Sequence, residues 1–160
     1  DIYNYFNSFN HYNCHKSFPS FRRNQILNTY KMRALLLIAP YKSDVQYGIK
    51  KTIIKELCQD SNIEFLTAED INVGSSLSAE ETIKFLLKCS FAVGDLSFER
   101  PSCYYEVGYL QSINKSVYLI AKSGTLIHQV LDKVNIKFYD NLEEYENLIA
   151  KIIKHEVCSR

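Results

Sequence analysis

From residue 33 onward, short runs of apolar residues alternate with longer stretches in which apolar residues recur every three or four positions. Short apolar runs are typical of buried strands, and the longer period is typical of amphipathic helices. Their alternation is the pattern of repeated βα units that build a parallel sheet. It predicts strands at 34–39, 63–66, 91–95, 117–120 and 136–139.

Capping signals mark the helices between these strands. The first predicted helix spans 45–59, with Asp44 as its N-cap. Its expected buried face consists of Ile49, Ile53 and Leu57. The second helix follows the capping box that begins at Ser78 and ends at Glu81. Its expected buried face consists of Ile83, Leu86 and Leu87.

A last helix is predicted by Asn141-Leu142-Glu143-Glu144, which repeats the capping-box pattern before an apolar stripe that ends near Lys154. The stripe consists of Leu142, Tyr145, Leu148, Ile149 and Ile152. Helices join the five predicted strands, and no connection is long enough for an extra domain. The sequence therefore predicts a three-layer α/β/α sandwich with a five-stranded parallel sheet, of Rossmann-like or flavodoxin-like type.

Residues 1–32 differ in character, and we treat them as an N-terminal arm or the tail of a preceding module, with the α/β domain at 33–160. Tyr and Phe are interleaved with Asn, and no clean period emerges. The aromatic rings are expected to pack on the main domain or on a neighbouring subunit, so self-association through the arm stays open. His11, Cys14 and His15 lack a fourth ligand at zinc-like spacing, so no metal site is predicted.

Composition and charge exclude several classes of protein. Of the 160 residues, 46% are hydrophobic and 23% are charged, which is ordinary for one globular domain. The net charge of +1, without a run of Lys and Arg, argues against nucleic acid as a partner. The five cysteines form no CxxC pair, which favours a reducing, cytoplasmic location over a disulfide framework. No apolar run approaches the roughly 20 residues that cross a bilayer, so no membrane partner is expected.

Two carboxylates around the third predicted strand are the main site candidates. Asp95 ends this strand, at the sheet edge where open α/β proteins bind ligands. Glu106 lies in the first turns of the next helix. This helix can begin with Pro101 as its first residue or with Ser102 as its N-cap, and in neither case is Glu106 the glutamate of a capping box. Its helical spacing places it on the sheet-facing stripe, where a carboxylate needs a partner or a function. The other members of this stripe are Cys103, Leu110 and Ile113.

Both carboxylates also have plainer interpretations. Glu106 can be a solvated side chain that the positive end of the helix favours. Asp95 can accept hydrogen bonds from the loop that follows it or cap the next helix. Its position fits these structural roles and the binding of ribose hydroxyls equally. Gly108, within the same helix, costs roughly 1 kcal/mol relative to Ala, which indicates a close approach of the helix to a strand or a ligand.

With strand order 2-1-3-4-5, the ligand crevice would lie between the first and third strands. The loops at 40–44 and 96–101 would then form one pocket, onto which Asp95 and Glu106 would both open. Candidate binding residues from these loops are Pro40, Tyr41, Lys42, Ser43, Ser97 and Arg100, with Lys42 and Arg100 as candidates for phosphate contact. The turn at 74–76 lacks the Gly patterns of a dinucleotide fingerprint and of a P-loop.

The stretch around these carboxylates resembles a known signature. It reads Asp-Leu-Ser at 95–97 and Glu-Arg-Pro-Ser-Cys-Tyr-Tyr-Glu-Val-Gly-Tyr at 99–109. It is similar to the signature of the nucleoside 2-deoxyribosyltransferase-like proteins and of their TIR-like nucleotide-binding relatives, many of which belong to bacterial defence systems. The likeness covers roughly 32–154. Ser102 and Cys103 depart from the pattern, which usually has Asn-Val.

The resemblance implies a pocket for a nucleoside or nucleotide, with Glu106 as the catalytic carboxylate at the anomeric carbon and Asp95 at the ribose. Breaking an N-glycosidic bond builds positive charge on that carbon, and a carboxylate can bond to it or stabilise it. Tyr41, Tyr104 and Tyr105 are implied to stack on a base or to order the carboxylate. Ser102 takes the place of the usual Asn, so substrate choice is in question if that Asn binds substrate.

Two functions follow from this resemblance and stay open at the level of sequence. One is an N-glycosidase or (deoxy)ribosyl-transfer enzyme that acts on NAD, a nucleoside or a nucleotide, with NAD as a candidate substrate and with no cofactor. The other is a non-catalytic sensor that binds a nucleotide signal and controls assembly or another domain. A third, purely structural role would leave an inward-facing Glu106 unexplained.

Overall fold

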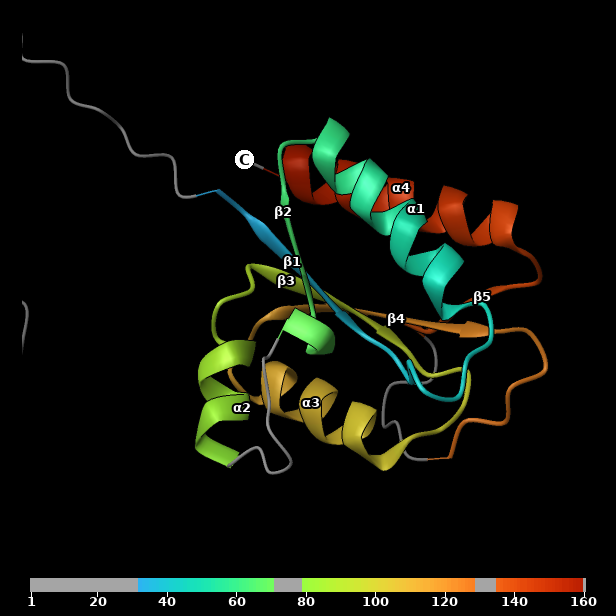
Figure 1. Cartoon of the computed structure of the whole chain (residues 1–160), viewed down its shortest axis with the longest axis horizontal. Helices are drawn as coiled ribbons and strands as arrows, with labels where there is room; N and C mark the ends of the chain where they lie inside the picture. The colour runs from blue at the N-terminus through green and yellow to red at the C-terminus, as the bar shows by residue number, and fades with distance from the viewer. Residues whose placement is uncertain (1–31, 71–78, 129–134, 160) are drawn as a thin grey trace, which may run out of the picture. The chain divides into compact units, whose positions relative to one another are not determined.

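The computed structural model describes residues 32–70, 79–128 and 135–159 (Figure 1). The strands are β1 Ala34–Ile38, β2 Glu64–Thr67, β3 Phe91–Asp95, β4 Ser116–Lys122 and β5 Lys137–Tyr139. The helices are α1 Tyr47–Asp60, α2 Ala79–Leu86, α3 Pro101–Ser112 and α4 Leu142–Cys158, and a short 3-10 helix, η1 Ala68–Asp70, follows β2. The predicted arm, apart from Met32, and the Ser78 cap lie outside the described residues.

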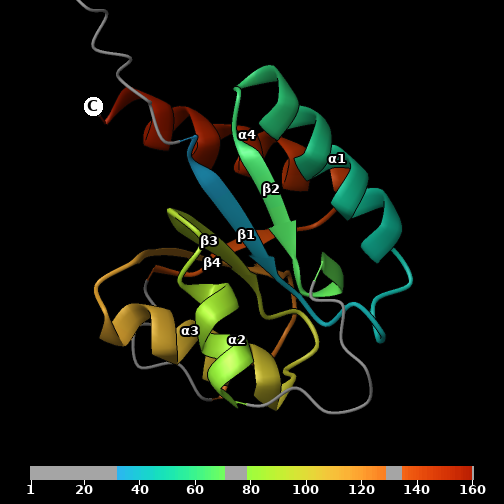
Figure 2. The same cartoon turned by 60° about the vertical axis from the view of Figure 1, so that its left-hand side comes forward.

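The strands form one parallel sheet in the order β2-β1-β3-β4-β5. Helices α1 and α4 cover one face of the sheet, and α2 and α3 cover the other (Figures 1 and 2). The three-layer sandwich predicted from the sequence is therefore confirmed. Among the described residues, no helix is long and apolar enough to cross a membrane.

Strand β1 lies in the middle of the sheet and separates two hydrophobic cores. Ala34, Leu36 and Ile38 pack on the side of α2 and α3. Leu35 and Leu37 pack on the side of α1 and α4. Because helices cover both faces, every residue of β1 is buried and the strand reads as one continuous apolar run.

Helix α1 differs from its prediction. It begins at Tyr47 rather than at residue 45, and Gln46 is its N-cap. The side chain of Asp44 accepts hydrogen bonds from the Gln46 N–H and from Lys50, so it does not cap the helix. The predicted buried face was only partly right, because Ile49 is 53% exposed whereas Ile53 and Leu57 are partly buried and pack against the core. The buried residues are Tyr47, Lys50, Ile54 and Cys58. This stripe was not recognised in the sequence because Lys50, a charged residue, is part of it.

The predicted inner face of α2 was only partly right. Phe85 and Leu86 are the buried residues of this helix. Leu87 follows the end of the helix and is exposed. Apolar spacing placed Leu87 on the inner face because the sequence did not show where the helix ends.

The N-terminal cap of α4 is confirmed. The Asn141 side chain accepts a hydrogen bond of 2.9 Å from the Glu144 N–H, and the Glu144 carboxylate accepts one of 2.8 Å from the Asp140 N–H. This nearly reciprocal pair satisfies backbone donors that the first turn of a helix leaves free. Helix α4 continues to Cys158, beyond its predicted end near Lys154.

The close approach that the sequence suggested at Gly108 occurs at Gly94 instead. A Cβ atom added at Gly108 would meet nothing within 4 Å. One added at Gly94 would lie 2.9 Å from Val107 Cγ2 and 3.3 Å from Leu119 Cδ2. Gly94 therefore allows α3 to pack closely against the centre of the sheet.

We expect Gly94→Ala and Gly108→Ala to have opposite effects on stability. The first forces Val107 away from its packed position and should cost about 1–3 kcal/mol of unfolding free energy. The second adds a methyl group in open space within a helix and should stabilise by about 1 kcal/mol. Chemical denaturation of both variants measures the difference, and a neutral Gly94→Ala would contradict the packing described.

Candidate active site

Asp95 and Glu106 lie on opposite faces of the sheet. Gly94 faces α3, and because side chains alternate along a strand, Asp95 points to the side of α1 and α4. Glu106 belongs to α3, on the other side. The structure thus separates two side chains that the sequence interpretation had placed at one crevice.

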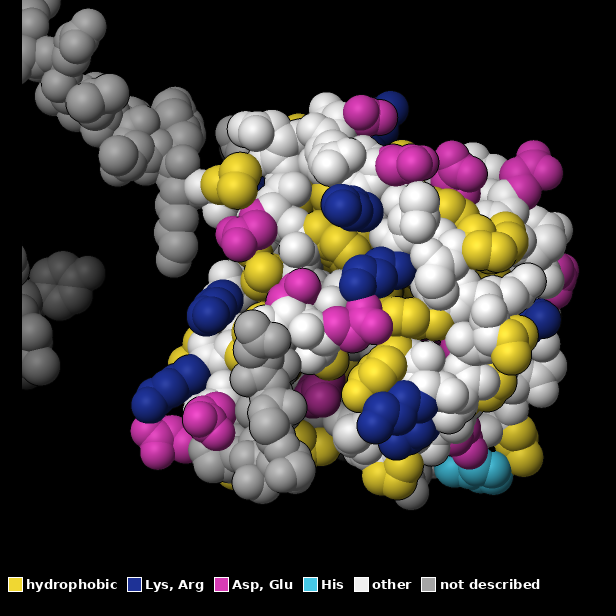
Figure 3. All heavy atoms as spheres, viewed as in Figure 1, with side chains coloured by type: hydrophobic (Ala, Val, Ile, Leu, Met, Phe, Trp, Pro, Cys, Tyr) yellow, Lys and Arg dark blue, Asp and Glu magenta, His cyan; other side chains and the backbone are white. Residues whose placement is uncertain are grey.

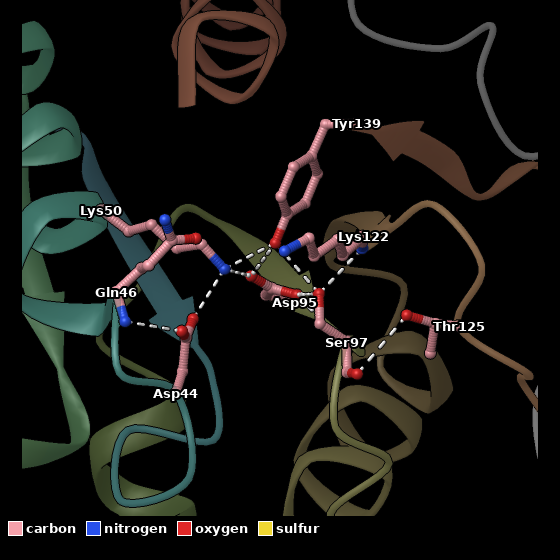
Figure 4. Close-up of polar contacts among 8 residues, drawn as sticks. All are labelled: Asp44, Gln46, Lys50, Asp95, Ser97, Lys122, Thr125 and Tyr139. Carbon is pink, nitrogen blue, oxygen red and sulfur yellow. Dashed lines mark hydrogen bonds and ion pairs between the residues drawn. The ribbon is translucent and has the colours of Figure 1, made fainter. Parts of the chain in front are cut away.

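Asp95 is only 1% exposed, and both of its carboxylate oxygens are occupied within the protein (Figure 4). Oδ1 accepts hydrogen bonds from the Ser97 N–H, at 3.0 Å, and from the Ser97 hydroxyl. Oδ2 accepts from Lys50 Nζ, at 3.0 Å, and from the Tyr139 hydroxyl, at 2.9 Å. The hydrogen bonds from Ser97 confirm the structural role considered for Asp95, in which its carboxylate accepts hydrogen bonds from the loop that follows β3. Ribose binding by Asp95 stays a prediction.

Lys50 connects three elements from its buried position on α1 (Figure 4). It is 3% exposed, and its ammonium donates to Asp44 Oδ2 at 2.6 Å, Asp95 Oδ2 at 3.0 Å and the Tyr139 hydroxyl at 2.6 Å. Burial by itself lowers the pKa of Lys50, but the charge of Asp95 and the hydrogen bonds to Asp44 and Tyr139 raise this pKa above its ordinary value. Lys50 is therefore a paired, charged group inside the domain.

Sequence reasoning missed Lys50 and Tyr139. A signal for Lys50 was present, because it lies three positions after Tyr47 and four before Ile54, on the true inner stripe of α1. Tyr139 comes at the end of β5, on the same face of the sheet as Asp95. Burial, followed by the charge of Asp95, raises the pKa of Tyr139 to about 12, so its hydroxyl stays protonated and donates to Asp95.

Ser97 extends this network to the next strands. Its hydroxyl lies 3.0 Å from the Tyr139 hydroxyl and accepts the Lys122 N–H at 2.8 Å. Its carbonyl oxygen accepts a hydrogen bond from the Thr125 hydroxyl at 3.4 Å. Substrate binding by Ser97 stays a prediction, since the described residues that line the cavity at Glu106 do not include it.

Glu106 lines a cavity of about 50 Å³ at the carboxyl edge of the sheet. Four predicted binding residues line it as well, namely Pro40, Tyr41, Arg100 and Ser102. The rest of its described lining consists of Ala39, Ala68 and Cys103. A smaller cavity of about 10 Å³, lined by Leu36, Phe85 and other core residues, also reaches Glu106. In the space-filling view, basic, acidic and hydrophobic side chains adjoin on one face of the molecule (Figure 3).

Three other predicted residues stand outside this lining. Lys42 and Ser43 are exposed and belong to the loop that supplies Tyr41. Tyr105 is 54% exposed and is not among the described residues that line the cavity. Lys42 follows Tyr41 directly, and Ser43 contacts Arg100, so both remain near the cavity.

Burial raises the pKa of Glu106 to about 7. No hydrogen bond or ion pair to its carboxylate is found among the described residues. Cys103, one turn earlier, is a protonated thiol at neutral pH, because burial and then the charge of Glu106 raise its pKa to about 11. A partly desolvated carboxylate without a donor is reactive as a base, as a nucleophile or as a counter-charge for a developing cation.

The loop before α3 holds Arg100 at the rim of this cavity. Glu99 adopts a left-handed backbone conformation with φ of 47°, and its carboxylate accepts hydrogen bonds of 2.8 Å from the Tyr104 hydroxyl and the His128 N–H. Pro101 is the first residue of α3, and Arg100 is its N-cap, which resolves the two registers left open by the sequence. Arg100 Nη1 lies 3.3 Å from Ser43 Oγ, across the crevice between the two loops.

A larger cavity, of about 450 Å³, lies away from these groups, beside β4 and α4. Its described lining includes Lys137, Lys151 and His155 but no carboxylate. Size alone would favour this cavity, but only the smaller one combines a carboxylate of raised pKa with residues from both predicted loops. No group of three or more potential metal ligands occurs among the described residues.

Known proteins match this chain at the level of structure. No family model matches the sequence, and neither does any curated protein. The CMP N-glycosidase BcmB of Clostridium botulinum matches with a TM-score of 0.59 at 11% identity, over 75% of this chain and 99% of that chain. A 2-deoxyribosyltransferase of Bacillus psychrosaccharolyticus matches with a TM-score of 0.52 at 12% identity, over 71% of this chain and 90% of that chain.

A 2-deoxyribosyltransferase of Leishmania mexicana matches with a TM-score of 0.54 at 15% identity, over 77% of this chain and 98% of that chain. The fold is nucleoside 2-deoxyribosyltransferase-like. This agrees with the fold that the sequence signature around Glu106 implied. At such low identities the likeness is one of fold, and the chemistry has to be argued from the residues of this chain.

The buried lysine network predicts a large difference between two adjacent substitutions. Lys50→Met leaves the Asp44 and Asp95 carboxylates buried without their cation and should cost about 3–5 kcal/mol of unfolding free energy. Lys51→Met removes only a partly exposed ion pair with Glu69 and should cost less than about 1 kcal/mol. Urea denaturation at pH 7 compares the two variants. Equal effects would show that the buried network does not stabilise the fold.

The raised pKa of Glu106 predicts a stability effect that depends on pH. A carboxyl group whose pKa rises on folding, from 4.5 to about 7, makes the folded state less stable as pH increases through that interval. Glu106→Gln should therefore stabilise the protein at pH 8, by on the order of 2 kcal/mol, and change little at pH 4. Thermal unfolding at the two pH values tests this, with Glu146→Gln on the exposed side of α4 as the control. A destabilised variant at pH 8 would contradict it.

Proposed function

We propose that this chain is an enzyme that cleaves the N-glycosidic bond of a nucleoside or nucleotide and passes the sugar to water or to another acceptor. The observation that carries the proposal is Glu106, a carboxylate with a pKa near 7 and no partner among the described residues, in a cavity at the ligand-binding edge of the sheet. The fold likeness to an N-glycosidase and to deoxyribosyltransferases supports the same reaction class.

Cleavage of an N-glycosidic bond needs a group that stabilises positive charge on the anomeric carbon. In the proposed reaction, a Glu106 oxygen bonds to that carbon while the base departs with the electron pair of the broken bond and takes up a proton from solvent. Water or an acceptor hydroxyl or amine then attacks the same carbon, loses a proton and frees the carboxylate. Burial helps, because a carboxylate stripped of water interacts more strongly with a cation.

The surrounding residues have separate parts in this proposal. Tyr41 lines the cavity and is 40% exposed, so its ring is available for stacking on a base. Ser102, at the same rim, offers a hydroxyl to the sugar. Asp95 and Lys50 act at a distance, by holding the loops at 40–44 and 96–100 on either side of the cavity. They are positioning residues rather than catalytic ones.

A sensor that binds a nucleotide without cleaving it is the second candidate. The observation that favours it is Cys103, which puts a buried, protonated thiol in the cavity lining beside Glu106. Such a thiol is a weak donor and adds little to a charged transition state. The two candidates differ in one measurable respect, the release of free base.

We expect the wild-type protein to release free base from at least one member of a panel of NAD, nucleosides and nucleotides. Glu106→Gln should lower kcat/KM by at least about 100-fold, since an amide can neither attack nor carry the counter-charge. Because the reactive form is the ionised carboxylate, wild-type kcat/KM should rise between pH 5 and pH 8, with a midpoint near 7.

Liquid chromatography of the released base gives the rates, and Glu146→Gln serves as a control that should keep full activity. Equal release by the wild type and Glu106→Gln would overturn the role of Glu106. Nucleotide binding in calorimetry without release of base would support the sensor instead.

A further inference from the structure

We infer that the rim of the Glu106 cavity binds phosphate, so that the substrates are nucleoside 5′-phosphates rather than free nucleosides. This inference rests on the proposed function and adds to it the part of the substrate that is recognised. The groups concerned are the guanidinium of Arg100, the hydroxyl of Ser43 and the ammonium of Lys42. They come from the two loops that face each other across the crevice.

Arg100 and Lys42 have no ion pair among the described residues, which they share with exposed lysines such as Lys154, but they lie on the two loops at the crevice. Arg33, Lys50, Lys51 and Lys84 each form an ion pair with a carboxylate. Arg100 makes one long hydrogen bond, of 3.3 Å, to the neutral hydroxyl of Ser43. Its other donors are available for an anion.

The acidic residues nearest in sequence are already engaged elsewhere. Glu99, next to Arg100, is held by Tyr104 and the His128 N–H. Asp44, in the loop of Lys42, is buried against Lys50. Neither of these two carboxylates therefore pairs with Arg100 or Lys42 at the crevice rim.

The second cation lies on the opposite loop. Lys42 Nζ lies 5.6 Å from the centroid of the Tyr41 ring, and Tyr41 lines the same cavity as Arg100 and Glu106. Helix α3 starts directly after Arg100 and has no acidic residue in its first turn. The positive end of this helix adds to the field of the two side chains. All these contributions attract an anion to the rim.

The distance from this rim to Glu106 suits a sugar phosphate. Glu106 follows Arg100 by six positions, which is about 9 Å along the axis of a helix. In a nucleoside 5′-phosphate the phosphorus lies five bonds from the anomeric carbon, a shorter span than this, and the long side chain of Arg100 covers the remainder when the anomeric carbon lies at Glu106. The cavity measures only about 50 Å³, so the charged group is expected at the open rim rather than inside.

A phosphate at this position would also protect the reactivity of Glu106. A dianion alone would raise the pKa of a nearby carboxylate and keep it protonated. Arg100 offsets that charge through paired, charge-assisted hydrogen bonds, which a guanidinium forms with phosphate better than an ammonium does. Free nucleosides would leave these donors without an acceptor.

Calorimetry with CMP, cytidine, dAMP and deoxyadenosine tests the inference. The titrations use the Glu106→Gln chain, in which the ligand is not consumed. We expect one or both monophosphates to bind at least about 10-fold more tightly than the matching nucleoside. Adding Arg100→Met should remove most of this preference while leaving nucleoside affinity unchanged, and Arg100→Lys should keep part of it. Lys154→Met, which removes one exposed charge from α4, is the control and should change nothing.

Each alternative result has a distinct meaning. Equal affinity for nucleosides and monophosphates, or an equal loss of both with Arg100→Met, would overturn the phosphate site while leaving the proposed function intact. A phosphate preference that depends on Arg100, together with no release of base by the wild type, would support the phosphate site and overturn the proposed function. Failure of every ligand to bind would overturn both. Circular dichroism of each variant verifies that it is folded.

Discussion

The domain depends on a buried lysine between two carboxylates. Lys50 of α1 joins Asp44, in the loop after β1, to Asp95, at the end of β3, and to Tyr139, at the end of β5. A buried charge without partners costs several kcal/mol, so α1 can pack on the sheet only when these residues come together. The same contacts hold the loops on either side of the crevice, and these loops supply Tyr41 and Arg100 to the cavity at Glu106.

Glu106 is the counterexample to this rule of pairing. Asp44, Asp95 and Glu156 are more deeply buried than Glu106, and each has a cationic partner. Glu106 has no such partner among the described residues, and its pKa rises in consequence. A structural role would favour pairing this carboxylate, whereas chemistry on a developing cation favours leaving it free. The site thus retains an electrostatic cost that the rest of the domain avoids, as expected where function and stability compete.

Local sequence patterns predicted the elements well and their inner faces less well. Strands covered on both sides are mostly apolar, so β1 and the first residues of β3, before Asp95, were visible as apolar runs. The inner face of α1 was predicted only in part, because it contains a lysine, and simple patterning counts a lysine as a surface residue. Gly108 was misread for a related reason. The sequence does not distinguish a glycine that is required for close packing from one that is not. In the structure, the glycine required for close packing is Gly94.

By itself the sequence determined the order of strands and helices, the α/β class and the choice of Glu106, because these depend on spacing and residue type within short segments. Only the tertiary structure decided which side chains meet. Strand alternation sends Asp95 to the face of α1 and away from Glu106, and Lys50 reaches Tyr139 across 89 positions of the chain. Long-range packing of this kind decided that Asp95 is engaged in holding the fold, while Glu106, on the other face, is left unpaired among the described residues.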